Sequence, residues 1–281
     1  MGDQVNFVAS FNKTKEELLA MDEVEFRARF RERCHHTMEI QVYAAENKGT
    51  SLRPQQTETA DKFLEVWDMR GLPHDLPEYI TAKKLHEFAD QLISGNKIDL
   101  SPYRPVGLSE EEIKLFERVV YERRSVRAWT DERVPDEVIK KILKAGLWGA
   151  HACNLQSIRY IVIREENAPG LFKGSDIPGG PVHIVICQDM RTYRANPVMP
   201  DANQLLDAGA AGQNIVLAAH AYGLGGCWLT FTSDKMKERI KEYAGLPEEV
   251  RLTTYVDVGY PDQTPYAPQR MSVEESIMFW K

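Results

Sequence analysis

The sequence predicts an α+β fold in which one central sheet is flanked by helices. Short apolar, β-branched runs at 159–164, 182–187, 227–231 and 252–259 have the length and composition of buried strands. A long segment, 201–222, is rich in alanine and keeps apolar residues at helical spacing. Strands and helices alternate only loosely, without strict βαβ units, which favours one layered sheet.

Composition restricts the function classes. With 281 residues, the chain can form one large domain or two ordinary ones, and its 43% apolar content is enough for a sizeable core. The formal net charge of -7 argues against general nucleic-acid binding. A phosphate ligand would therefore need a local cationic pocket.

Cysteine usage and hydropathy predict a soluble cytoplasmic protein. Cys34, Cys153, Cys187 and Cys227 are far apart and form no Cys-x-x-Cys motif, so we expect reduced thiols and no structural metal. No apolar run approaches the roughly 20 residues that span a bilayer. Residues 1–6 carry neither a myristoylation nor a secretion signal, and no membrane partner is expected.

Residues 1–107 are predicted to be a mainly helical N-terminal extension. Thr14 and Glu17 have the spacing of a capping box at a helix start. Two further helices are predicted at 59–69 and 85–93, where apolar residues keep the helical period.

Several familiar motifs are absent or lack the right context. His35 and His36 are adjacent, so on a helix they point about 100° apart and do not share a metal. His183 and His220 fall in a predicted strand and helix, where a core role is expected. Gly223-Leu-Gly-Gly226 follows a helix rather than a strand, unlike a dinucleotide-binding loop.

Residues 108–281 are predicted to form the sheet domain. Ser109 and Glu112 form a second capping box, and the helix that they begin carries an apolar stripe of Ile113, Phe116, Val119 and Val120. Pro135 is suited to the first turn of the next helix. In the long helix 201–222, Gly209 and Gly212 are expected to permit close approach of a neighbouring segment in a core or subunit interface.

Arginine is concentrated directly after the helix predicted to begin at Ser109. Arg123, Arg124, Ser125 and Arg127 lie within five residues, and guanidinium groups match the geometry of phosphate or another planar anion. A solvated basic turn would give the same composition. The arginines alone leave both interpretations open.

Six motifs, taken in order, resemble the FMN-dependent nitroreductase superfamily over about residues 109–281. Each motif is weak alone, but their shared order and spacing are specific. They are Arg123-Arg-Ser-Val-Arg127, Val134-Pro135 with its helix, Asn154-Leu-Gln156, the helix Asp207–Ala219, Gly223-Leu-Gly-Gly-Cys-Trp228, and Val258-Gly-Tyr-Pro261 followed by Arg270.

The resemblance implies an intertwined homodimer with a central mixed sheet and one FMN in each of two interfacial clefts. By this resemblance, Arg123, Ser125 and Arg270 would hold the FMN phosphate. Arg127 would face the pyrimidine edge of the ring, where a cation stabilises the negative charge of reduction. Arg124 would contribute main-chain and ribityl contacts.

The resemblance also places a second group of residues along the flavin ring. Trp228, Leu229 and Thr230 would lie beside it, with backbone N–H near N5, the atom that exchanges hydride. Asn154 and Gln156 would reach the flavin partly from the other subunit.

Two departures from the family pattern affect this loop. Gly149-Ala150-His151 replaces the usual Ala-Pro-Ser, and Gln156-Ser157-Ile158 replaces Gln-Pro-Trp. Ala150 and His151 complete the expected cofactor contacts. His151 could line the substrate cleft and donate a hydrogen bond or proton, because histidine titrates near neutral pH; alternatively, it only replaces the serine. Cys153 is expected to be a small buried thiol rather than a redox group.

The function implied is FMN-dependent oxidoreduction by a ping-pong cycle. NADH or NADPH would be the electron donor, and a small planar molecule such as a nitroaromatic, quinone or activated alkene the acceptor. The alternatives are a reductive dehalogenase, a flavin-dependent dehydrogenase or oxidase, and a flavin-binding protein without turnover.

The extension is a third departure, because most family members begin near the Arg-x-Ser motif. It could wrap the dimer or cover the cleft as a lid. Wrapping is favoured because its large apolar residues need a place to be buried, namely Phe63, Trp67, Leu85, Phe88 and Leu92.

Overall fold

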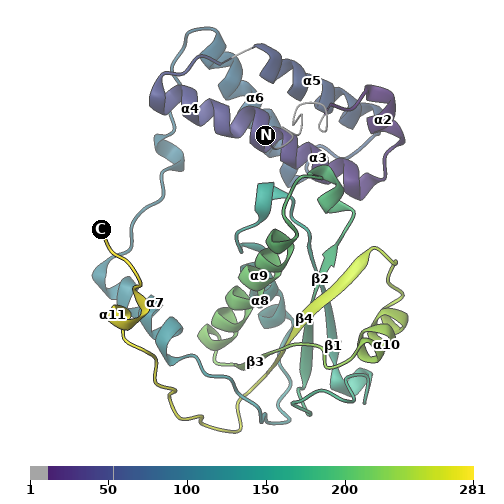
Figure 1. Ribbon diagram of the computed structural model, residues 1–281, viewed down its shortest axis with the longest axis vertical. Helices are drawn as coiled ribbons and strands as arrows, with labels where there is room; N and C mark the ends of the chain where they lie inside the picture. The colour runs from purple at the N-terminus through teal and green to yellow at the C-terminus, as the bar shows by residue number, and fades with distance from the viewer. Residues whose placement is uncertain (1–11, 53) are drawn as a thin grey trace.

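The computed structural model describes residues 12–52 and 54–281, so the expectation about residues 1–6 lies outside the described part. A helical layer formed by the extension lies at one end of a domain built on a single sheet (Figure 1). The sheet has four strands in the order β1-β2-β4-β3. The predicted α+β fold with one central sheet is confirmed.

All three strand pairs of this sheet are antiparallel. The only parallel link recorded within residues 12–52 and 54–281 is an isolated bridge between Ser125 and Gly226. Among the described residues, the parallel pairing expected of a mixed sheet is therefore limited to that bridge. The strands are β1 (Ile158–Arg164), β2 (Val182–Asp189), β3 (Gly225–Leu229) and β4 (Val250–Gly259).

Helices cover both faces of the sheet because its strands are apolar on both sides. On one face, α8 (Asp136–Leu147) and α9 (Asp201–Ala221) bury Ile142 and Ile215 against Ile184 and Val256. On the other face, α10 (Asp234–Ala244) contributes part of a second core. The predicted helix 201–222 is thus confirmed as a core helix.

The extension has its own hydrophobic core. Phe26, Phe30, Phe63 and Trp67 are fully buried against one another. This core corrects the basis of the wrapping hypothesis: the apolar side chains are buried within the extension and do not require a partner subunit. The helices are α2 (Lys15–Ala20), α3 (Glu23–Cys34), α4 (Ile40–Lys48), α5 (Pro54–Met69) and α6 (Pro77–Ile93), with a π-helical turn η1 (His35–Glu39) and a 3-10 turn η2 (Ser101–Tyr103).

Helix α3 joins the extension to the sheet domain. It packs against the 3-10 turn η5 (Thr192–Ala195), and Ala28 lies in one buried cluster with Leu155, Tyr193 and Ala195. The remaining short turns are η3 (Ala152–Asn154) and η4 (Glu165–Asn167).

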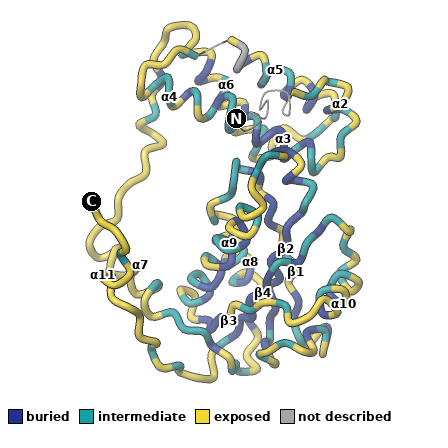
Figure 2. Tube along the Cα trace, in the orientation of Figure 1, coloured by how far each residue is buried: buried dark blue, intermediate teal, exposed yellow. Residues whose placement is uncertain are grey.

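Helix α7 (Glu110–Glu122) contacts α9, but most of it projects to one side of the sheet domain together with α11 (Val273–Ser276) and the C-terminus. Figure 2 shows how exposed these segments are. The capping boxes at Thr14 and Ser109 are confirmed. The predicted apolar stripe of α7 is present, but Ile113 and Phe116 are 43% and 58% exposed within one chain. This face is available to another chain.

Candidate functional site

The arginine-rich segment is held in extended form along the sheet. The backbone N–H of Val126 donates to the Gly226 carbonyl at 3.2 Å, and that of Thr130 donates to the Tyr260 carbonyl at 2.9 Å. We call residues 123–130 the cationic strap. Backbone bonds at both ends fix it beside β3 and the end of β4.

Glycine is required where the strap crosses β3. A Cβ at Gly225 would lie 2.6 Å from Val126 Cβ, too close for any side chain without movement. The Trp129 indole N–H donates to the Gly225 carbonyl at 2.9 Å, which fixes the same crossing from the other side. The Gly-Leu-Gly-Gly motif thus serves the close approach of the strap.

Cations from the strap and the chain's last segment converge. Burial, followed by the nearby positive charges of Arg270 and Arg124, lowers the pKa of Arg123 below its ordinary value. Within residues 12–52 and 54–281, neither Arg123 nor Arg270 has a recorded hydrogen-bond acceptor or ion-pair partner. Two adjacent cations without a counter-ion favour binding of an anion.

The other two strap arginines differ in their contacts. Arg124 donates to the carbonyls of Tyr121 and Arg123 at 2.6 and 3.0 Å, so its guanidinium supports the strap's own backbone. Arg127 is exposed and makes one long bond, 3.3 Å, to the Ser125 carbonyl. Of these two side chains, that of Arg127 makes fewer contacts within the chain and is therefore more available to a ligand.

The strand that follows the glycine turn presents its residues to opposite faces. Trp228 is 39% exposed, packs on Gly212 of α9 and donates to Thr254 Oγ1 at 2.7 Å. Leu229 packs instead into the core beside α10, and only its backbone can line a ligand on the Trp228 face. Thr230 is exposed at the strand end. Gly209, unlike Gly212, has no neighbouring atom within 4 Å of its Cβ position, so its expected close approach is absent within one chain.

A second group of expected site residues lies in the loop between α8 and β1. Cys153, Asn154 and Gln156 have φ angles of 50°, 53° and 53°, which non-glycine residues rarely adopt. The Gln156 amide donates to Asn154 Oδ1 at 3.0 Å. Such a concentration of strained backbone is typical of ligand-binding loops and persists only when the surroundings enforce it.

Two buried residues that sequence reasoning missed hold this loop in place. Asp207 of α9 accepts the Ala152 backbone N–H at 2.9 Å and the Tyr193 hydroxyl at 2.8 Å. Tyr193 also lies 2.7 Å from Ser157 Oγ. The available signal was that Asp207 is the one acidic residue of α9 beyond its first turn, whereas nothing in the sequence indicates Tyr193.

His151 has one constrained and one free ring nitrogen. Its Nδ1 lies 2.6 Å from the Gly149 carbonyl, which can only accept, so Nδ1 carries the proton. Its Nε2 is buried without a partner among the described residues. A neutral His151 therefore presents an acceptor at Nε2, and donation from that atom requires the imidazolium form.

The loop borders a shallow apolar cavity of about 620 Å³ against the N-terminal half of α9. Leu205 and Leu206 are 62% and 67% exposed there. The lining also includes Ala150, His151, Asp207 and Ala210.

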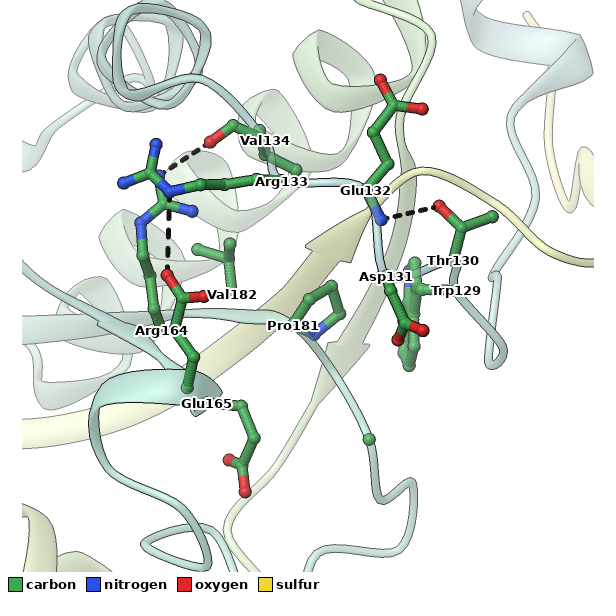
Figure 3. Close-up of a pocket in the computed structure, with 12 residues that line it drawn as sticks. Trp129, Thr130, Asp131, Glu132, Arg133, Val134, Arg164, Glu165, Pro181 and Val182 are labelled. Carbon is green, nitrogen blue, oxygen red and sulfur yellow. Dashed lines mark hydrogen bonds and ion pairs between the residues drawn. The ribbon is translucent and has the colours of Figure 1, made fainter.

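A second cavity, of about 320 Å³, contains none of the expected site residues (Figure 3). It lies where residues 129–134 meet the end of β1, and Arg164 there donates to the Val134 carbonyl at 2.7 Å.

The strap and the loop are separate within one chain. The strap crosses β3 near Val216 of α9, while the loop contacts Asp207. Nine residues of helix separate these points, roughly 13 Å at 1.5 Å per residue. One chain thus brings together Arg123, Arg270 and the strap, and separately His151, Asn154 and Gln156, but does not join the two groups.

The remaining expectations have mixed outcomes. His183 is buried, as expected, whereas His220 is only half-buried and lies near Glu122 and the arginines. Cys153 is half-buried, and burial raises the pKa of its thiol, which disfavours the reactive thiolate.

In the described part of the chain, no helix combines the length and apolar character of a membrane span, and no group of three or more potential metal ligands occurs.

The fold and the strap define an α+β protein with a cationic edge beside its sheet. A model of the Nitroreductase family matches residues 120–172 and 168–260, together about half of the chain. The chain belongs to the Nitroreductase family.

Relatives agree with this assignment. A protein from Archaeoglobus fulgidus, provisionally named NADH dehydrogenase/NAD(P)H nitroreductase, is 31% identical over 150 residues, covering 51% of this chain and 84% of the relative. The NADPH-flavin oxidoreductase of Vibrio harveyi is 28% identical, with coverage of 53% and 66%. The FMN complex of a provisionally assigned nitroreductase from Desulfovibrio desulfuricans superposes with a TM-score of 0.52 at 28% identity, covering 59% of this chain and 96% of that one.

Proposed function

We propose that this family member is an FMN-dependent NAD(P)H oxidoreductase that acts on a small planar acceptor such as a nitroaromatic, quinone or activated alkene. The observation that carries the proposal is the convergence of Arg123 and Arg270 beside the backbone-fixed strap. A dianionic phosphate would relieve the repulsion between these cations. Relatives named for FMN and NAD(P)H chemistry support the same cofactors.

The residues present fit such a cofactor. Arg123, Ser125 and Arg270 would hold its phosphate, and Arg127 would place a positive charge at the ring. Trp228 and the backbone of Leu229 and Thr230 would lie along the ring. When bound, FMN supplies the hydride-exchanging centre, and nicotinamide donor and acceptor would occupy one cleft in turn.

The strap and the loop would complete one cleft if a second copy supplied the missing group. We infer a homodimer in which Asn154, Gln156, Ala150 and His151 reach a cofactor held by the partner's strap. The exposed apolar face of α7 and the exposed leucines of α9 support this arrangement.

If Arg123 and Arg270 hold the FMN phosphate, replacing either one should weaken FMN binding, whereas replacing an arginine elsewhere should not. Arg270→Gln and Arg123→Gln should each weaken FMN binding about 10- to 100-fold, because each removes a charge-assisted bond. Titration with FMN, followed by flavin fluorescence, measures the dissociation constant. Arg133→Gln is the matched control, since Arg133 is 57% exposed and pairs with Asp136 and Glu166 instead. Equal effects from all three variants, or a wild-type protein that binds no FMN, would contradict the proposal.

Rapid mixing separates the functional alternatives. Fast bleaching of the flavin by NADH or NADPH is expected for the reductase. Slow bleaching with both would favour a flavin-dependent dehydrogenase or oxidase, or a binding protein without turnover. Halide release from a halogenated aromatic would identify a reductive dehalogenase.

A further inference from the structure

One buried side chain of the extension donates a hydrogen bond to the backbone of the strained loop. Arg31 of α3 is 7% exposed, and its Nη2 donates to the Leu155 carbonyl at 2.8 Å. Its Nη1 lies 3.3 Å from Glu78 Oε1 on α6. Burial lowers the pKa of Arg31 to about 10, against the opposing charge of Glu78, so the guanidinium remains a cation at neutral pH.

The bonded carbonyl belongs to the centre of the strained segment. Leu155 itself is fully buried, while Asn154 and Gln156 on either side have left-handed backbone. Residues in this conformation relax unless their neighbours hold them. A charged donor on the carbonyl between them provides such a restraint.

Three successive carbonyls of the segment are held from three elements. The Leu155 carbonyl accepts from Arg31, the Gln156 carbonyl from Arg159 at 2.9 Å, and the Ser157 carbonyl from the Asp189 backbone N–H at 3.0 Å. Arg159 and Asp189 belong to the sheet domain. Of these three donors, Arg31 alone comes from the extension.

We propose that Arg31 is a positioning residue through which the N-terminal extension fixes the loop that presents Asn154 and Gln156 to cofactor and acceptor. This proposal rests on the proposed function, and it assigns the extension a role in the site. Arg31 acts only through the Leu155 backbone and touches no reacting group.

Arg29 provides a matched control on the same helix. It is 3% exposed, and its Nη2 donates to the Arg194 carbonyl at 2.8 Å and to Glu25 Oε1 at 3.3 Å. Each arginine therefore donates to one carbonyl of the sheet domain and to one carboxylate within the extension. Only the Arg31 carbonyl lies in the strained loop.

The test compares Arg31→Lys with Arg29→Lys in the full chain. Lysine keeps the charge, but it lacks the guanidinium fork that reaches two acceptors in different directions. The first readout is the rate at which iodoacetamide labels Cys153, resolved by peptide mass spectrometry. Cys153 lies inside the loop and is half-buried, whereas Cys34, Cys187 and Cys227 are buried reference thiols. This readout requires no flavin.

We expect Arg31→Lys to accelerate Cys153 labelling about tenfold or more, the effect of losing a hydrogen bond from a charged group. In the FMN-loaded protein, it should also raise the acceptor KM by a similar factor with little change in kcat. Arg29→Lys should lower the melting temperature by about as much as Arg31→Lys does. It should leave the Cys153 labelling rate and the acceptor KM within about twofold of wild type.

Equal effects of the two variants on labelling and KM would overturn the proposal. So would faster labelling without any change in KM or FMN affinity. If the wild-type protein binds no FMN, the proposed function fails, whereas Cys153 labelling still decides whether Arg31 positions the loop.

Discussion

His183 is the buried centre of a hydrogen-bonded network of titratable side chains on β2, β4 and η4. Its Nδ1 lies 2.6 Å from Asp257 Oδ1, its Nε2 lies 3.1 Å from Glu165 Oε2, and its ring stacks on Phe172 with centroids 3.8 Å apart. His183 is 2% exposed and Asp257 is fully buried. Burial by itself would lower the pKa of His183, but the hydrogen bond and charge of Asp257, followed by those of Glu165, raise it overall.

This network predicts a pH dependence of stability. A histidine pKa that is higher in the folded state contributes stability below its unfolded value of about 6.5, and that contribution is lost as pH rises through the folded value. Burial also raises the pKa of Asp257, against the charge of His183, which acts in the same direction. The free energy of unfolding, measured by urea denaturation from pH 6 to 9, should fall more steeply in wild type than in His183→Gln. Parallel curves for the two proteins would contradict the prediction.

Residue-scale prediction from sequence is strongest where one residue type has a narrow physical use. The glycines before Trp228 indicated a tight turn, and the close approach of Val126 to Gly225 agrees with it. The anion site indicated by the arginine density near Arg123 stays a prediction. The same reasoning could not find Arg31, because an arginine on a charged helix has no local signal of burial.

At the scale of elements, α7 has a clear apolar side without a partner in one chain. Its polar side is centred near Lys114, and its apolar side near Phe116, by the 100° step of the helix. An exposed stripe of this kind is typical of a subunit interface.

The stripe predicts that Phe116→Glu converts a dimer to a monomer, because it places a charge in the apolar contact. FMN affinity should fall at least about tenfold, since each cleft would lose residues from the partner. Analytical ultracentrifugation measures the oligomeric state, and Lys114→Glu is the control on the opposite side. A Phe116→Glu protein that remains dimeric would exclude α7 from the interface.

Local sequence rules predicted where helices begin better than they predicted which surfaces those helices pack against. The capping residues Thr14 and Ser109 begin helices as predicted. The helix predicted at 59–69 instead begins at Pro54, because proline is tolerated in the first turn. Propensity did not reveal that the apolar side of α7 lies uncovered within one chain.

For the whole molecule, the main question is what the extension contributes. Its core is self-contained, yet Ala28 helps to bury Leu155, Tyr193 and Ala195 of the sheet domain. Its removal would expose these apolar side chains and leave the Leu155 carbonyl without Arg31.

We therefore predict that deletion of residues 1–105 gives insoluble or monomeric protein. The soluble fraction after expression and the elution volume on size exclusion measure the outcome, with the full chain as reference. A soluble, fully active dimer would show that the extension is dispensable for the sheet domain. Wrapping of the dimer by the extension stays a separate prediction.

The sequence by itself determined the class of fold, the family and the cationic character of the strap. These properties depend on local spacing: apolar periodicity, capping residues, glycine turns and the order of short motifs. Only the tertiary structure decided that Asp207 holds the Ala152 backbone, that Arg31 holds Leu155, and that the strands pair as β1-β2-β4-β3. The physical reason is that such contacts join distant parts of the chain, and their energy depends on burial and geometry that exist only after the elements pack.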